Sequence, residues 1–294
     1  MDVKVLDISF FNDTEPSGKI KECFEQEDVI LIRGLDLDEN RFEALTRIFC
    51  DDFCRISSRE SLRKREGDGL TTHTPRENFF LFSHSEAAYA PYPKTPDIGF
   101  LMCKEAPIVP GGETTLVDGV EFLNEMAHEL RKRFKNEKII YEFLWEPDRW
   151  KAQFRVSSEE ELFALLNTLN TIKFSLNNGL LHMFYTTSAL TRMADGSYAF
   201  SNAILAHLPS LDHPDYKNKK VYCKESNKVY WESGELLPKE IVNQLVTIQD
   251  KLKYKHQWKV NDILIFNNLR YMHGREMTQG VSNRELFSRF GYVL

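Results

Sequence analysis

Two histidines, each at the end of an apolar stretch, constrain this fold more than any other feature of the sequence. His84 follows the apolar run 79–82 and stands two residues before Glu86, whereas His273 follows the strand-like segment 258–268. Two imidazoles and one carboxylate are the ligand set of a facial triad, which leaves other positions of an octahedral Fe(II) open. Each histidine would have to face inward from a strand end, as in a β-barrel.

A second motif of the same form competes with the first. Eight histidines and 44 acidic residues in 294 positions make roughly one accidental His-x-Asp/Glu triplet expected. His213-Pro214-Asp215 is the other triplet, and it lies in a polar stretch with a proline directly after the histidine. That composition is typical of a surface turn. The apolar run before His84 therefore favours His84 and Glu86 as the ligand pair.

The periodicity of the chain predicts many short strands and a few amphipathic helices. Helices are expected over 38–54, from Asp118 through Phe134, and over 238–253, and Asn178-Gly179 predicts a tight turn between two strands. Strands are expected at 28–34, 79–82, 98–103, 114–117, 262–267 and 286–294. The pattern indicates a mainly β fold, a barrel or jelly roll with peripheral helices. No repeat or linker divides residues 1–294, so a single domain is expected.

Composition narrows the classes of partner. The net charge is −6 and no long basic run occurs, which argues against a nucleic-acid-binding surface. The N-terminus has no signal-peptide pattern, and no apolar run approaches the roughly 20 residues of a membrane helix. A soluble, cytoplasmic protein without a membrane partner is therefore expected. The five cysteines lack the spacing of a disulfide scaffold or a zinc site, although Cys50 and Cys54 would share a face of the first helix.

Three segments, taken in order, resemble the taurine dioxygenase/TfdA-like family of Fe(II)/2-oxoglutarate oxygenases. They are residues 84–91 (HSEAAYAP), 110–119 (PGGETTLVDG) and 261–268 (NDILIFNN) continuing to His273-Gly274-Arg275. The chain looks closer to the branch that has glutamate as the metal carboxylate, such as clavaminate synthase and free amino-acid hydroxylases. The resemblance covers the chain from about Asp28 to the C-terminus.

The resemblance implies a double-stranded β-helix that holds Fe(II) through His84, Glu86 and His273. It also implies that 2-oxoglutarate and dioxygen are co-substrates, and that Thr114 and Arg284 bind the distal carboxylate of 2-oxoglutarate. A planar guanidinium grips a carboxylate at two points, in agreement with this role for Arg284. Arg289 is a nearby rival. Because the family's halogenases lose the metal carboxylate, the presence of Glu86 argues against halogenation.

The substrate is constrained less well. The resemblance implies a small molecule such as an amino acid or a derivative, hydroxylated at an unactivated C–H bond, and a carrier-protein thioester stays open. Desaturation or cyclisation at the same site, a catalytically silent metal-binding jelly roll, and a cupin-like enzyme without 2-oxoglutarate are the alternatives. Candidate substrate residues are Tyr89, Tyr92, Arg192, Asn202, His207 and Arg289.

Overall fold

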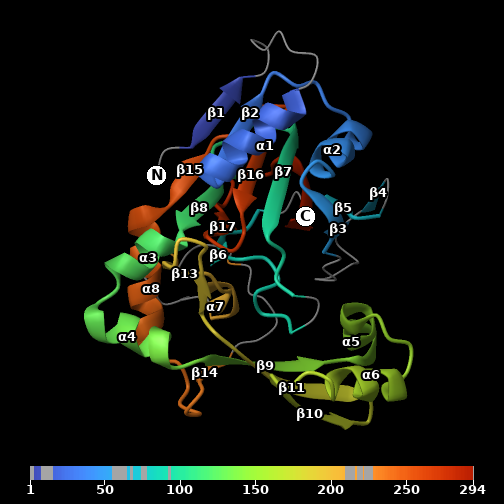
Figure 1. The fold of residues 1–294 in the computed structure, drawn as a ribbon, viewed down its shortest axis with the longest axis vertical. Helices are drawn as coiled ribbons and strands as arrows, with labels where there is room; N and C mark the ends of the chain where they lie inside the picture. Colours follow the sequence, from blue (N-terminus) through green and yellow to red (C-terminus); the bar gives the residue numbers. More distant parts are fainter. Residues whose placement is uncertain are drawn as a thin grey trace.

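Two facing β-sheets form the centre of the molecule (Figure 1). The computed structural model describes residues 3–7, 16–54, 65–66, 69–73, 78–91, 94–208, 216, 221 and 228–293. The larger sheet contains, in order, β1 (Lys4–Asp7), β2 (Val29–Arg33), β16 (Ile263–Asn267), β7 (Ile98–Glu105), β18 (Glu285–Val293), β5 (Thr71–His73) and β4 (Arg65–Glu66), with β3 (Cys50–Phe53) also paired to β18. The smaller sheet contains β15 (Tyr254–His256), β8 (Thr114–Asp118), β17 (Tyr271–Arg275) and β6 (Leu81–His84).

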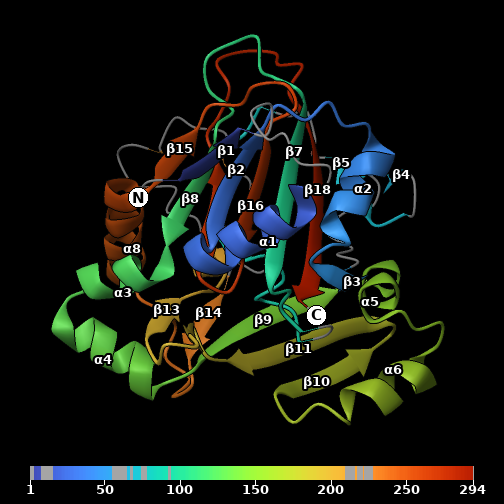
Figure 2. The same ribbon diagram turned by 45° about the horizontal axis from the view of Figure 1, so that its top comes forward.

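The central strands of the larger sheet are apolar on both faces, because each face packs against a different layer. In β16, Leu264 and Phe266 belong to the core between the sheets, while Ile263 and Ile265 belong to the core on the other side. Side chains alternate across a strand, so one strand serves both cores. The second core is covered by α1 (Pro16–Glu27) and α2 (Glu39–Thr46), and α1 lies across this face in Figure 2. The predicted mainly β jelly roll with peripheral helices is confirmed.

The first predicted helix is wrong in its second half. Asp38 caps α2 through a 2.9 Å bond from the main-chain N–H of Arg41, but the helix ends at Thr46. Residues Cys50–Phe53 form β3 instead and pair with the end of β18. Short apolar runs fit helix and strand periodicity equally well, and pairing with the edge of a sheet decides here for the strand. Cys50 and Cys54 therefore do not share a helical face.

The second predicted helix is divided in two. Asp118 caps α3 (Gly119–Glu125) by accepting from the main-chain N–H of Val120, as the capping pattern predicts. The chain is extended at Met126, and α4 (His128–Asn136) begins two residues later. The third predicted helix is confirmed as α8 (Lys239–Leu252), which packs on α3 and β8.

A third sheet lies at one end of the two central sheets, at the bottom of both views (Figures 1 and 2). Its strands are β10 (Ile172–Asn177), β11 (Leu180–Thr187), β9 (Ile139–Trp145) and β14 (Val229–Trp231). Asn178 and Gly179 have φ of 51° and 80° in the β10–β11 turn, which confirms that hairpin. The remaining elements are α5 (Pro147–Phe154), α6 (Glu159–Leu166), α7 (Ile204–His207), β12 (Leu190–Arg192) and β13 (Tyr198–Phe200).

Tyr141 and Phe143 of β9 belong to the same buried cluster as Leu116 and Phe266 of the central sheets. One apolar core therefore joins the third sheet to the other two. Within the described part of the chain, no helix has the length and apolar character needed to cross a membrane.

Candidate metal centre

His84 and His273 meet because their strands are neighbours. His84 is the last residue of β6, His273 is in the middle of β17, and the two are direct cross-strand partners. Directly opposite residues of paired strands place their side chains on the same face. Gly274 follows His273 on the other face, where an added Cβ would lie 2.6 Å from the carbonyl oxygen of Leu81. Glycine at this position thus permits the close approach of β17 to β6.

Glu86 completes a cluster of three buried groups. Ligand atoms of His84, Glu86 and His273 all lie within 4.8 Å of one another. Oε2 of Glu86 is 3.3 Å from Nε2 of His84 and 3.7 Å from Nε2 of His273. None of the three residues exposes more than 9% of its surface. Two nitrogens and one anionic oxygen converging in a buried space fit a divalent transition metal.

The surroundings hold both imidazole rings in place. Nδ1 of His84 lies 3.0 Å from the carbonyl oxygen of Phe82. A proton on Nδ1 satisfies that carbonyl and leaves the lone pair of Nε2 for a metal. The ring of His273 packs against those of Phe266 and Phe290, with both centroid distances 5.4 Å. These phenylalanines come from the larger sheet, so the cluster lies between the two sheets.

The turn after β6 carries Glu86 and is held by main-chain contacts. The N–H of Ser85 donates to the carbonyl of Asn202 at 2.9 Å, and the N–H of Glu86 donates to Oδ1 of Asn268 at 2.8 Å. Ala87 has a φ of +59°, a left-handed conformation that alanine rarely adopts. Strained backbone of this kind persists only where the surroundings impose it. The sequence reasoning missed Asn268, because only the spatial position of its amide distinguishes it from other loop asparagines.

Arg284 and Thr114 form a second polar group, and Thr114 lies on the same face of the smaller sheet as His273. Nη2 of Arg284 donates to Oγ1 of Thr114 at 3.2 Å, and Nε1 of Trp258 donates to the same oxygen at 3.1 Å. A hydroxyl has two acceptor lone pairs and one hydrogen to donate. Since two N–H groups occupy the lone pairs of Thr114, its hydrogen is available to another acceptor.

The charge of Arg284 has no carboxylate bonded to it among the described residues. Arg284 is 2% exposed, and its Nε and Nη1 have no hydrogen-bond partner in the described part of the chain. Burial, and next the charge of Arg275, hold the pKa of the Arg284 guanidinium well below its usual range. A buried cation of this kind is stabilised by a bound anion. The donors that remain free in this group fit a carboxylate.

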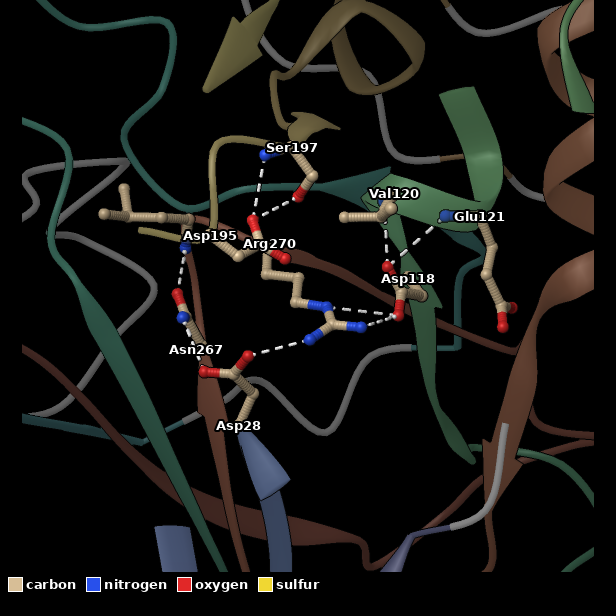
Figure 3. A network of polar contacts seen from close by, with 9 residues as sticks. Asp28, Asp118, Val120, Glu121, Asp195, Ser197, Asn267 and Arg270 are labelled. Atoms are coloured by element: carbon tan, nitrogen blue, oxygen red, sulfur yellow. Dashed lines mark hydrogen bonds and ion pairs between the residues drawn. The ribbon is translucent and has the colours of Figure 1, made fainter. Parts of the chain in front are cut away.

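A network around Arg270 fixes the turn between β16 and β17, three residues before His273 (Figure 3). Its guanidinium donates at 2.8 Å to Asp118, the end of β8, and at 2.8 Å to Asp28, just before β2. Asn267 in the same turn also donates to Asp28, at 2.9 Å. The turn is therefore tied to both central sheets.

Tyr89 and His207 lie together at the third sheet. The centroid of the His207 ring is 4.8 Å from that of Tyr89 and 5.7 Å from that of Phe143 in β9. Both residues are almost fully buried, and Tyr89 follows Glu86 in the same turn. They form a buried aromatic cluster next to the turn that carries Glu86.

The structure also describes two further candidate substrate residues, Asn202 and Arg192. The side-chain amide of Asn202 donates to the carbonyl of Ala189 and accepts from the N–H of Ile204, both at 3.0 Å. Its nitrogen and its oxygen are therefore both bonded within the protein. Arg192 is exposed on β12 rather than buried with the metal ligands.

Arg289 lies on the opposite face of β18 from Phe290. It donates to Thr71 at 2.8 Å and pairs with Glu43 of α2 at 3.3 Å. These contacts favour Arg284 over Arg289 as the residue that binds a carboxylate, because strand alternation turns the Arg289 side chain toward the helices. Tyr92, His213 and Asp215 lie outside the described residues.

A jelly roll with two histidines and a glutamate between its sheets is the architecture expected of a non-haem iron oxygenase. Residues 2–289 match the family model described as taurine catabolism dioxygenase TauD, TfdA family, and the chain belongs to this family. It is a 2-oxoglutarate-dependent non-haem iron dioxygenase, for which Fe(II) is the cofactor and 2-oxoglutarate and dioxygen are co-substrates.

The chain is also similar to individual proteins, at low identity. It is 21% identical over 272 residues to the dapdiamide synthesis protein DdaC of Enterobacter agglomerans, which covers 89% of this chain and 82% of that protein. A taurine dioxygenase from Burkholderia xenovorans superposes with a TM-score of 0.57 at 10% identity, over 100% of this chain and 87% of the other. AAD-2, solved with Mn(II) and N-oxalylglycine, also gives 0.57, at 12% identity over 99% and 94% of the two chains. These two structures agree with the fold described above.

Proposed function

We propose that His84, Glu86 and His273 hold the Fe(II) of this dioxygenase. The observation that carries the proposal is the convergence of their ligand atoms within 4.8 Å in a buried space between the sheets. Two neutral imidazoles and a carboxylate leave one net positive charge on a bound Fe(II), which an anionic co-substrate offsets. Three protein ligands would leave the remaining positions of an octahedral Fe(II) for 2-oxoglutarate and dioxygen.

Thr114 and Arg284 are proposed to bind the distal carboxylate of 2-oxoglutarate. Leu116 is the cross-strand partner of His273, and Thr114 is two residues before Leu116 in β8, on the same face. Two residues of an extended strand span roughly 6.8 Å. A five-carbon dicarboxylate that chelates the metal at one end can bridge this separation. The free hydrogen of Thr114 and the free N–H groups of Arg284 would receive its far carboxylate.

When bound, the metal, 2-oxoglutarate and dioxygen would supply the oxidising chemistry, in which one oxygen atom enters succinate as carbon dioxide is released and the other is available for a substrate C–H bond. The protein residues orient the reactants and exclude water. Phe266 and Phe290 are both buried against the His273 ring and shield it from water. Arg284 neutralises the distal carboxylate away from the metal and thereby sets the direction in which the keto-acid end points.

We further propose that the substrate is a small amino-acid-like molecule that is hydroxylated at an unactivated C–H bond. Support comes from the resemblance to the glutamate branch of the family and from the similarity to a protein of dapdiamide synthesis. Tyr89 and His207 are the candidate substrate neighbours, because Tyr89 lies in the turn that carries Glu86 and the His207 ring packs against it. Whether the substrate is free or carrier-tethered is an outcome of the substrate screen.

An anaerobic titration of the apo-protein with Fe(II) and 2-oxoglutarate tests the proposal. The wild type should develop the weak visible charge-transfer band of the metal–keto acid chelate, and His84→Ala should not. A screen of amino acids for substrate-dependent succinate formation follows. A folded wild-type protein without the band, or a His84→Ala variant with a band of normal intensity, would overturn the assignment of these ligands.

A further inference from the structure

The amide of Asn268 makes two bonds to the main chain of the residue that carries the metal-site carboxylate. Its Oδ1 accepts from the N–H of Glu86 at 2.8 Å, and its Nδ2 donates to the carbonyl oxygen of Glu86 at 3.2 Å. Nδ2 also donates to the carbonyl oxygen of Pro96 at 2.8 Å. Asn268 is fully buried, so no water competes for these bonds.

We propose that Asn268 is a positioning residue that fixes the main chain of Glu86 so that its carboxylate reaches the metal. This proposal rests on the assignment of Glu86 as a ligand. A glutamate has one more rotatable bond than an aspartate. For the same movement of its Cα, its carboxylate therefore reaches a wider range of positions. Holding the N–H and the carbonyl of the same residue removes the freedom of the backbone and leaves only that of the side chain.

The two bonds from the Asn268 amide to the main chain of Glu86 form a clamp, and the surroundings of Asn268 make this clamp rigid. Asn268 is in the turn between β16 and β17, which the Arg270 network ties to both central sheets (Figure 3). Its own main-chain N–H donates to the carbonyl of Asp97 at 2.8 Å. The same turn leads into His273, so one short segment sets the positions of two of the three proposed ligands.

The strained residue after Glu86 supports the same conclusion. Ala87 has a φ of +59°, and an unrestrained turn would relax away from that conformation. The clamp on Glu86, together with the bond from Ser85 to Asn202, holds the chain on either side of the metal carboxylate. The backbone is therefore preorganised before any metal binds.

The test is the affinity of the apo-protein for Fe(II) alone, measured anaerobically by competition with a chromophoric chelator. Asn268→Ala should weaken binding by roughly 10- to 100-fold, the usual effect of removing a group that orients a metal ligand. Asn267→Ala is the matched control. It removes an asparagine from the same turn whose partners are Asp28 and the N–H of Leu269 rather than Glu86, so it should weaken Fe(II) binding far less than Asn268→Ala does; equal weakening by the two variants would overturn the proposal.

Glu86→Ala separates the two proposals. In that background Asn268→Ala should have no further effect on Fe(II) affinity, because no carboxylate remains to position, whereas a general loosening of the fold would still weaken binding. If Glu86→Ala binds Fe(II) as tightly as the wild type, the metal-site assignment fails. If Glu86→Ala weakens binding and Asn268→Ala does not, the site stands and the positioning role is overturned.

Asn268→Asp replaces Asn268→Ala if the alanine variant does not fold. It preserves the volume but places an oxygen against the carbonyls of Glu86 and Pro96. The added negative charge would by itself attract a cation. Weaker Fe(II) binding by this variant would therefore be due to the lost donor bonds, and equal or tighter binding would overturn the proposal.

Discussion

Arg284 donates to Thr114 across the gap between the two central sheets. Thr114 begins β8 of the smaller sheet, and Arg284 immediately precedes β18 of the larger one. Trp258 donates to the same hydroxyl, which is thereby turned into a donor for any further partner. The groups proposed to bind 2-oxoglutarate therefore also join the sheets, and their substitution has separable effects on binding and on stability.

Arg284→Leu should weaken 2-oxoglutarate binding strongly. A carboxylate in a buried pocket without its guanidinium loses roughly 2–5 kcal/mol, or about 30-fold or more in affinity. The dissociation constant of 2-oxoglutarate is measured from the chelate band of the anaerobic Fe(II) protein. The apo-protein should lose little stability, because the variant also removes a buried charge that Arg275 repels.

Arg289→Leu is the control for that experiment. Arg289 is as buried as Arg284, but its partners are Glu43 and Thr71. Its loss should lower the midpoint of thermal unfolding and leave 2-oxoglutarate binding intact. The reverse pattern, with normal binding in Arg284→Leu and weak binding in Arg289→Leu, would contradict the proposed site.

Thr114→Val should weaken 2-oxoglutarate binding and also destabilise the protein. Valine has nearly the same shape but leaves the N–H groups of Trp258 and Arg284 without their acceptor, at about 1–3 kcal/mol for each buried donor. Thr114→Ser retains the hydroxyl and should restore most of the affinity. Chelate-band titration and chemical denaturation of both variants measure the two effects, and equal 2-oxoglutarate affinity in Val and Ser variants would exclude a contact from the hydroxyl.

The sequence was sufficient to propose the three ligands because each histidine follows an apolar segment and Glu86 stands two residues after the first of them. His84 follows the apolar run 79–82 and His273 follows the strand-like segment 258–268, whereas their direct pairing is seen only in the structure. The same reasoning could not separate Arg284 from Arg289. Their difference depends on strand alternation from Leu286 onward and on what covers each face, which requires the three-dimensional arrangement.

The structural role of amide side chains was not accessible to sequence reasoning. Asn202 and Asn268 both look like loop residues, and either could contact a substrate. In the structure, the side-chain amide of Asn202 bonds the main chain of Ala189 and Ile204, whereas that of Asn268 bonds the main chain of Glu86. The third sheet was also only partly predicted, because β9 and β14 are far apart in sequence and nothing local indicates that they pair.

Glu86→Gln should abolish turnover without unfolding the protein. Glutamine keeps the size of the side chain but removes the proposed anionic ligand, so the loss should exceed the roughly 10- to 100-fold effect of changing a group that only orients a ligand. Succinate formation with substrate measures activity, and circular dichroism checks the fold. Near-normal, 2-oxoglutarate-dependent turnover by this variant would remove Glu86 from the metal site.

Asp262 should make the stability of the protein depend on pH in acid. Burial opposes its ionisation, but bonds from His256 and Arg33 outweigh it and lower the pKa of Asp262 from 3.8 to about 2. A depressed carboxyl pKa contributes stability that is complete above about pH 4 and is lost as the pH falls through 2. Asp262→Asn should therefore reduce the free energy of unfolding by about 2 kcal/mol at pH 7, and this difference should shrink between pH 4 and 2. Chemical denaturation of both proteins at pH 7, 4 and 3 measures it. Because Asp262 ties β16 to Arg33 of β2 and His256 of β15, a difference that stays constant over this range would mean that packing, rather than the charge of the carboxylate, holds these three strands together.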